Sequence, residues 1–118
     1  MNAIKNKVQL IGTINVPIII MTPSNLKVAD ILVHTIESYR NKDGEKVTES
    51  MWHKCRAHGK LADIIDKYTA KGMEVAVEGS LIQTSYTLHG KIIPETLIQI
   101  TELLILSKMP EPVQTSNA

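Results

Sequence analysis

The sequence predicts an all-β fold: a five-stranded Greek-key barrel with one α-helix between its third and fourth strands. Apolar and polar residues alternate with the period of a β-strand along most of the chain, and one segment in the middle switches to the period of a helix. The 118 residues suit one domain, and the hydrophobic fraction of 43% with only 3% aromatic residues predicts an aliphatic core. We expect one domain over residues 1–108 and a short disordered tail over residues 109–118.

The first strand places Val8, Leu10 and Gly12 on one face. The next segment, residues 18–21, is apolar throughout and lies between Pro17 and Pro23. Four apolar residues in a row indicate either a strand that is buried on both faces or an interface. The flanking prolines favour an edge strand, so we expect Ile18 and Ile20 to lie in a contact between subunits.

Two long strands follow, at about residues 27–39 and 47–59. Alternation places Ala29, Ile31 and Val33 on the inner face of the earlier strand. Asp43-Gly44 lies between the two strands and is typical of a hairpin turn.

A helix is predicted over residues 60–70, where an apolar stripe includes Leu61, Ile65 and Tyr68 and is expected to face the core. Gly72 ends it. Strands then follow from residue 75 and over about residues 95–106, with a turn at His89-Gly90. Three strands, a helix and two strands in this order are the pattern of the OB-fold, whose barrels bind oligonucleotides or oligosaccharides.

The strand at about residues 47–59, the third of this order, carries the residues that point to a function. Alternation gives its outer face rings and cations, and its inner face mostly small residues; the outer set is Trp52, Lys54, Arg56, His58 and Lys60, and the inner set is His53, Cys55, Ala57 and Gly59. Rings that stack on bases and cations that contact phosphates together bind single-stranded nucleic acid. The alternative is an ordinary solvated surface, although a tryptophan among cations favours a binding site.

Net charge is only +1 and by itself gives no indication of nucleic acid. Between Tyr39 and Lys60, however, the sequence contains six cations and only three carboxylates. We expect the six to contact phosphate: Arg40, Lys42, Lys46, Lys54, Arg56 and Lys60.

The sequence predicts no catalytic centre, metal or cofactor. His53 and Cys55 point to the face opposite His58, so the three side chains cannot converge on a metal. A single cysteine, with no secretory signal or membrane span, favours a reducing, cytoplasmic location.

Several motifs, collinear over about residues 5–108, resemble those of the bacterial single-stranded DNA-binding protein (SSB) family. They are Asn6-Lys-Val-Gln-Leu-Ile-Gly12, Glu37-Ser-Tyr-Arg40, Trp52-His53, Gly59-Lys-Leu-Ala62, Lys71-Gly72 and Glu78-Gly79. The resemblance implies an OB-fold, a homotetramer (with a dimer as the fallback) and binding of single-stranded DNA without sequence preference in replication, recombination or repair. It also implies a location at the bacterial nucleoid.

The resemblance further implies roles for particular residues. Base-stacking positions would be Tyr39, Trp52, His58 and Tyr86, and His53 would lie at a subunit interface. Some of these rings are smaller than the family's usual ones, so weaker binding or a different binding mode is expected. The family's acidic C-terminal tip is absent from residues 109–118, so docking of replication proteins through such a tip is not expected; a phage or mobile-element member would look like this. The alternative function is a dimeric OB-fold interaction module of the primosomal type.

Overall fold

The structure is a computed structural model that describes residues 5–107. The predicted tail at residues 109–118 lies outside the described residues. No helix within residues 5–107 has the length and apolar character needed to cross a membrane.

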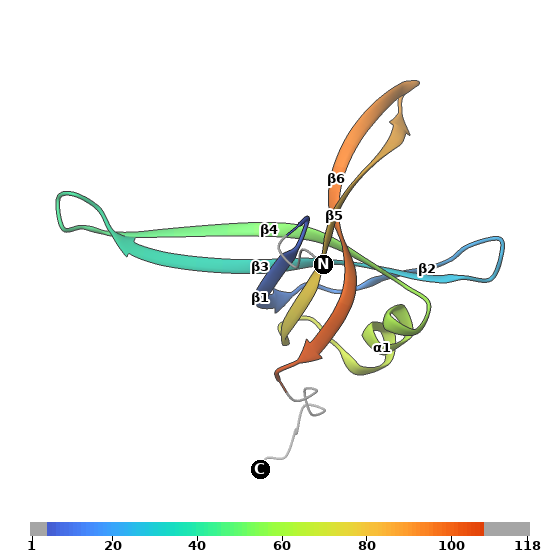
Figure 1. Ribbon diagram of the computed structural model, residues 1–118, viewed down its shortest axis with the longest axis horizontal. Helices are drawn as coiled ribbons and strands as arrows, with labels where there is room; N and C mark the ends of the chain where they lie inside the picture. The colour runs from blue at the N-terminus through green and yellow to red at the C-terminus, as the bar shows by residue number, and fades with distance from the viewer. Residues whose placement is uncertain (1–4, 108–118) are drawn as a thin grey trace, which may run out of the picture.

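Five strands close into a barrel, as predicted, and the helix lies between the third and fourth of them. The sheet order is β1-β5-β6-β4-β3, and β3 pairs again with β1 to complete the circle (Figure 1). A sixth strand, β2, adds to the outside of β3. The elements are β1 (Val8–Ile14), β2 (Ile18–Met21), β3 (Lys27–Arg40), β4 (Lys46–His58), α1 (Lys60–Tyr68), β5 (Glu74–Leu88) and β6 (Lys91–Ile105).

Two long hairpins project from the barrel in different directions, one formed by β3 and β4 and the other by β5 and β6 (Figure 1). Both turns fall where the sequence predicts them. Gly44 has a φ of 78° and donates its N–H to the carbonyl of Asn41 at 3.0 Å. At the other turn, His89 and Gly90 also have positive φ angles.

The barrel is filled by aliphatic side chains from every strand that surrounds it. Ala29, Ile31 and Val33 of β3 are buried, as the alternation predicts, and Cys55 and Ala57 of β4 lie with them. The core contains no aromatic side chain among its buried residues. The described rings therefore lie outside the core.

Two glycines in the strands allow backbones to approach closely as the sheet curls. A Cβ atom at Gly12 would lie 2.1 Å from the carbonyl oxygen of His34, and one at Gly79 would lie 2.0 Å from that of Gln99. Gly79 also follows a register shift between β5 and β6. Larger residues at these two positions would push neighbouring strands apart.

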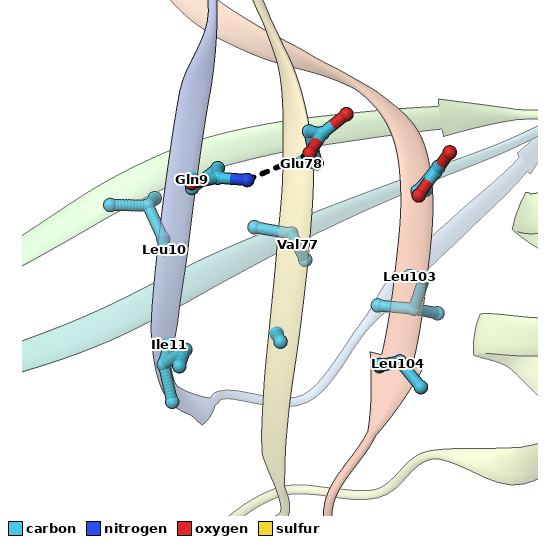
Figure 2. Close-up of a pocket in the computed structure, with 9 residues that line it drawn as sticks. Gln9, Leu10, Ile11, Val77, Glu78, Leu103 and Leu104 are labelled. Carbon is cyan, nitrogen blue, oxygen red and sulfur yellow. Dashed lines mark hydrogen bonds between the residues drawn. The ribbon is translucent and has the colours of Figure 1, made fainter.

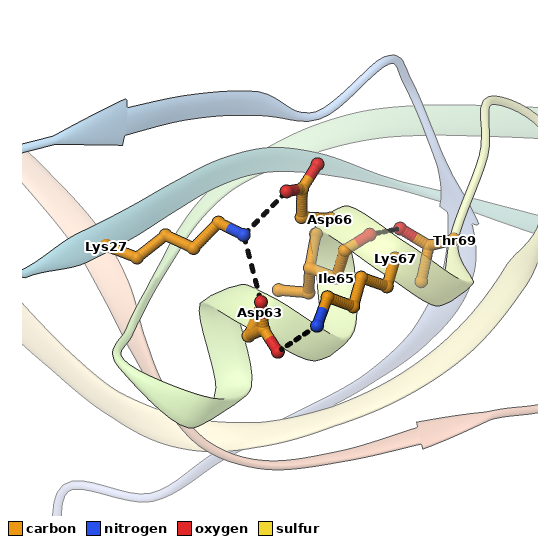
Figure 3. Close-up of polar contacts among 6 residues, drawn as sticks. All are labelled: Lys27, Asp63, Ile65, Asp66, Lys67 and Thr69. Atoms are coloured by element: carbon orange, nitrogen blue, oxygen red, sulfur yellow. Dashed lines mark hydrogen bonds and ion pairs between the residues drawn. The ribbon is translucent and has the colours of Figure 1, made fainter.

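The helix packs on the barrel through Ala62 and Ile65, while Tyr68 is 59% exposed. The expectation that Tyr68 faces the core is therefore wrong. The helix ends at Tyr68, and its buried face continues instead into Thr69, whose hydroxyl donates to the carbonyl of Ile65 (Figure 3). Lys27 of β3 forms ion pairs with Asp63 and Asp66 of the helix.

The apolar segment at residues 18–21 forms an edge strand, as its prolines indicate. Ile18 is 58% exposed and Ile20 is 50% exposed, whereas Ile19 packs against the core. The alternative of a strand buried on both faces is therefore wrong for this chain.

Candidate nucleic-acid interface

The outer face of the β3–β4 hairpin brings together the rings and cations that the sequence predicts for β4. Paired residues of antiparallel strands share a face, and the pairs here are His34 with Trp52 and Asp30 with Arg56. Trp52 is 55% exposed, whereas Cys55 is fully buried on the inner side. We call this outer face, including Asp30, His34, Trp52, Lys54, Arg56 and His58, the Trp52 face.

His34 covers one side of the Trp52 ring. The two ring centroids are 4.2 Å apart and the ring planes differ by only 12°. His34 is absent from the residues predicted for this site, because its place opposite Trp52 depends on the exact register of β3 and β4, which the turn motif alone does not set. The indole is therefore held in a cross-strand stack rather than standing alone.

Two of the expected phosphate-binding cations are already paired with carboxylates. Arg56 makes two hydrogen bonds to Asp30, at 2.8 and 3.1 Å. Lys54 donates to Glu95 of β6 at 2.7 Å. Donation of these hydrogen bonds to Asp30 raises the pKa of Arg56, which remains charged. The Trp52 face is consequently less positive than the cations of β4 alone would make it.

The other four predicted cations lie at the two ends of this region. Lys42 and Lys46 are exposed at and next to the hairpin turn, where Arg40 donates to the carbonyl of Gly44 at 2.7 Å. Lys60 is exposed but begins α1, because β4 ends at His58. Its expected place in the alternation of the strand is therefore wrong.

The predicted stacking residues do not all share one face. Tyr39 is exposed but pairs with Val47, five residues along β3 from His34, and so points to the opposite side of the hairpin from Trp52. His58 lies on the Trp52 face and is half-buried.

Tyr86 lies on the second hairpin and is exposed. Thr84 pairs with Glu95, and Tyr86 is two residues beyond Thr84, so Tyr86 and Glu95 share a face. Because Glu95 contacts Lys54, this face adjoins the Trp52 face. Lys54 also lines a separate groove of about 270 Å³, together with Asn15, Ile18, Asp30, Ile31 and Leu32.

The inner face of β4 carries Cys55 and His53. Burial raises the pKa of the Cys55 thiol to about 12, so the reactive thiolate is disfavoured. The Nε2 atom of His53 lies 3.0 Å from the hydroxyl oxygen of Thr35, within hydrogen-bond distance. Among residues 5–107, no group of three or more histidine, cysteine or acidic residues is placed to hold a metal.

A second exposed apolar surface lies on the outer side of the β1–β5–β6 sheet. Ile11, Ala76 and Leu104 form a row across the three strands, and Ile11 and Leu104 are each 63% exposed. All three line a groove of about 300 Å³. Figure 2 shows Ile11 and Leu104 there, together with the hydrogen bond from Gln9 to Glu78, which is 2.8 Å long. The sequence pattern alone did not predict this surface, because it forms only when the three strands lie side by side.

Comparisons with known proteins agree with this fold. The model of the "Single-strand binding protein family" matches residues 5–102. A solved structure of a Plasmodium falciparum SSB in complex with single-stranded DNA is 30% identical, with a TM-score of 0.78; the match covers 91% of this chain and 100% of that chain.

Two structures of the single-stranded DNA binding protein from Thermus aquaticus share the fold at 24% identity. A deletion mutant has a TM-score of 0.78 and the wild type 0.75, and each match covers 87% of this chain. This chain spans about half the length of those proteins, at 51% and 50%. From the family match over most of its length, and from the 30% identity to the Plasmodium protein, the chain belongs to the single-strand binding protein family.

Proposed function

We propose that the chain binds single-stranded DNA on the Trp52 face and the adjoining face of the β5–β6 hairpin, and that it protects single strands during replication, recombination or repair. Family membership supports the binding of single strands directly, and it does not favour the alternative of a primosomal-type interaction module. The observation that carries the assignment of the face is an exposed tryptophan that shares its face with two cations of the same strand, Lys54 and Arg56.

Base stacking supplies affinity without sequence preference, because every base has a flat face. Trp52, His58 and Tyr86 would provide rings, with Tyr39 engaging the strand where it passes around the edge of the β3–β4 hairpin. The exposed Lys42, Lys46 and Lys60 would contact phosphates directly. Arg40, Lys54 and Arg56 would do so after exchanging their present partners for phosphate oxygens.

We also propose that the chain works as an oligomer, a homotetramer or else a dimer. Ile18 and Ile20 on the edge strand support one contact, since an exposed apolar edge favours pairing with another chain. The row of Ile11, Ala76 and Leu104 supports a second contact. His53 is proposed at a subunit interface on the strength of its match to the family's motif. A bacterial member would act at the nucleoid, where single strands form.

The test is binding of a fluorescein-labelled oligo(dT), followed by anisotropy, with Trp52→Ala and Tyr68→Ala compared with the unchanged protein. Tyr68 is the matched control because it is an equally exposed ring on α1, away from the Trp52 face. Losing one stacked ring costs about 1–3 kcal/mol, so W52A is expected to bind about 5- to 150-fold more weakly. Y68A is expected to bind as the unchanged protein does; equal binding by all three would contradict the assignment of this face.

A further inference from the structure

We propose that His34 is a positioning residue for DNA binding: its ring supports one face of the Trp52 indole and so presents the opposite face to a base. The inference rests on the proposed function of the Trp52 face. The new element is a role for His34, a residue that is in neither the predicted stacking set nor the predicted phosphate-contacting set.

The contact between the two rings is close and well aligned. The centroid distance of 4.2 Å and the angle of 12° describe a face-to-face stack between directly paired residues of β3 and β4. Such a contact restricts the side-chain rotations of the indole, because any large rotation would break the stack. An indole that is already oriented loses less conformational entropy when a base binds.

The strand pairing shows which face of the indole remains open. His34 lies between Trp52 on one side and Thr13 of β1 on the other. β4 pairs with β6 only at Cys55 and Arg56, so within the described sheet the edge of β4 away from β3 is unpaired at Trp52. The free face of the indole therefore turns toward that open edge, on the side where Lys54 reaches Glu95.

A base can then stack on the free face, with His34, Trp52 and the base forming one continuous stack. In this arrangement His34 acts through Trp52 and does not itself touch the DNA. The role differs from that of an independent stacking ring in one measurable way: the effect of removing His34 depends on Trp52 being present.

The experiment is a double-mutant cycle with labelled oligo(dT), using His34→Ala, Trp52→Ala and the double variant. We expect H34A to weaken binding about two- to tenfold, the range expected for ordering one large side chain. In the W52A background, H34A is expected to cause no further loss. A loss of equal size in both backgrounds would overturn the proposal, because His34 would then contact DNA on its own.

Two replacements and a control separate the ring from general disturbance of the strand. His34→Phe keeps a ring and is expected to bind within about twofold of the unchanged protein, whereas His34→Leu is expected to lose affinity as H34A does. Met51→Ala alters the residue beside Trp52 on the opposite face and is expected to bind normally. Equal binding by H34L and the unchanged protein would also overturn the proposal.

A readout without DNA completes the test. Trp52 is the single tryptophan, so acrylamide quenching of the free protein reports on this ring alone. Quenching is expected to be more efficient in H34L than in H34F, because the uncovered ring face becomes accessible; equal quenching would count against the stack. If the unchanged protein does not bind oligo(dT), the proposed function fails. If it binds and W52A weakens binding while H34A and H34L do not, only the role of His34 fails.

Discussion

The two central cations of the Trp52 face, Lys54 and Arg56, form ion pairs with carboxylates from neighbouring strands. Asp30 holds Arg56 and Glu95 holds Lys54, and the carboxylates are more buried than their cationic partners, with side chains 14% and 20% exposed. A phosphate of the DNA must therefore compete with a carboxylate for each of these cations. The pairing limits the number of counterions that DNA binding releases, and so limits its dependence on salt.

Releasing Lys54 from its partner is expected to tighten DNA binding. Glu95→Gln removes the charge that neutralises Lys54, and we expect higher affinity for oligo(dT) together with a steeper salt dependence, by about 0.7 in the slope of log K against log salt. Glu49→Gln is the matched control, since Glu49 is an exposed carboxylate on the opposite face of β4. If E95Q and E49Q change affinity and slope alike, the ion pair does not restrain Lys54.

At the scale of elements, Lys27 of β3 anchors the single helix. Its amine lies 2.9 Å from Asp63 and 2.6 Å from Asp66, both on α1 (Figure 3). Hydrogen bonds from Lys27 and then from Lys67 hold the pKa of Asp63 below its usual value. A depressed pKa in the folded state stabilises the fold above the ordinary carboxyl pKa, and this contribution is lost as pH falls through the depressed value.

Replacing Lys27 should therefore matter near neutral pH and less in acid. Lys27→Met is expected to lower the urea midpoint at about pH 7, and the difference from the unchanged protein should shrink at about pH 2.5, because the contribution of Asp63 is lost as pH falls through its depressed pKa. Lys71→Met, which alters an exposed lysine just beyond the helix, should show little change at either pH. A K27M deficit of the same size at both pH values would show that the lysine acts through its packing and not its charge.

The hairpins show what the sequence could and could not predict at this scale. Alternation identified the inner residues of β3 and β4, and Asp43-Gly44 located the turn. A two-residue turn there would pair Lys42 with Glu45 and place His34 beside His53. In the structure the turn is one residue longer: Asn41 pairs across it with Glu45, which shifts the register by one and brings His34 to Trp52.

Contacts between elements far apart in the chain were beyond prediction from the sequence. Glu95 reaches Lys54 only because the barrel places β6 beside β4, and the row from Ile11 to Leu104 exists only once β1, β5 and β6 lie together. Tyr68 fits an apolar helical stripe, but the exact rotation of α1 against the barrel exposes it. Local periodicity determines which residues share a face, whereas closure of the sheet determines which faces meet.

At the scale of the whole molecule, two of the exposed apolar surfaces within residues 5–107 lie on different elements, the edge strand β2 and the outer side of the β1–β5–β6 sheet. Two distinct self-contacts on one chain allow an assembly larger than a dimer, because each subunit can bind two others. The long hairpins extend away from the barrel (Figure 1) and so remain available to DNA around such an assembly.

Sedimentation of the unchanged protein at micromolar concentration is expected to give a mass well above the 13.1 kDa of one chain, with a tetramer as the predicted state. Ile20→Lys and Leu104→Lys each place a charge on one surface and are expected to yield smaller assemblies. If both variants keep the mass of the unchanged protein, neither surface is an interface, and a stable monomer of the unchanged protein would contradict self-association altogether.

The central claim is that a single strand of DNA stacks on Trp52, and the most direct measurement is the fluorescence of this single tryptophan during titration at low salt. Oligo(dT) is predicted to quench the emission to saturation, and duplex DNA of the same length, whose bases are stacked on one another, is predicted to cause little change. Emission that stays constant in excess oligo(dT) would contradict the account.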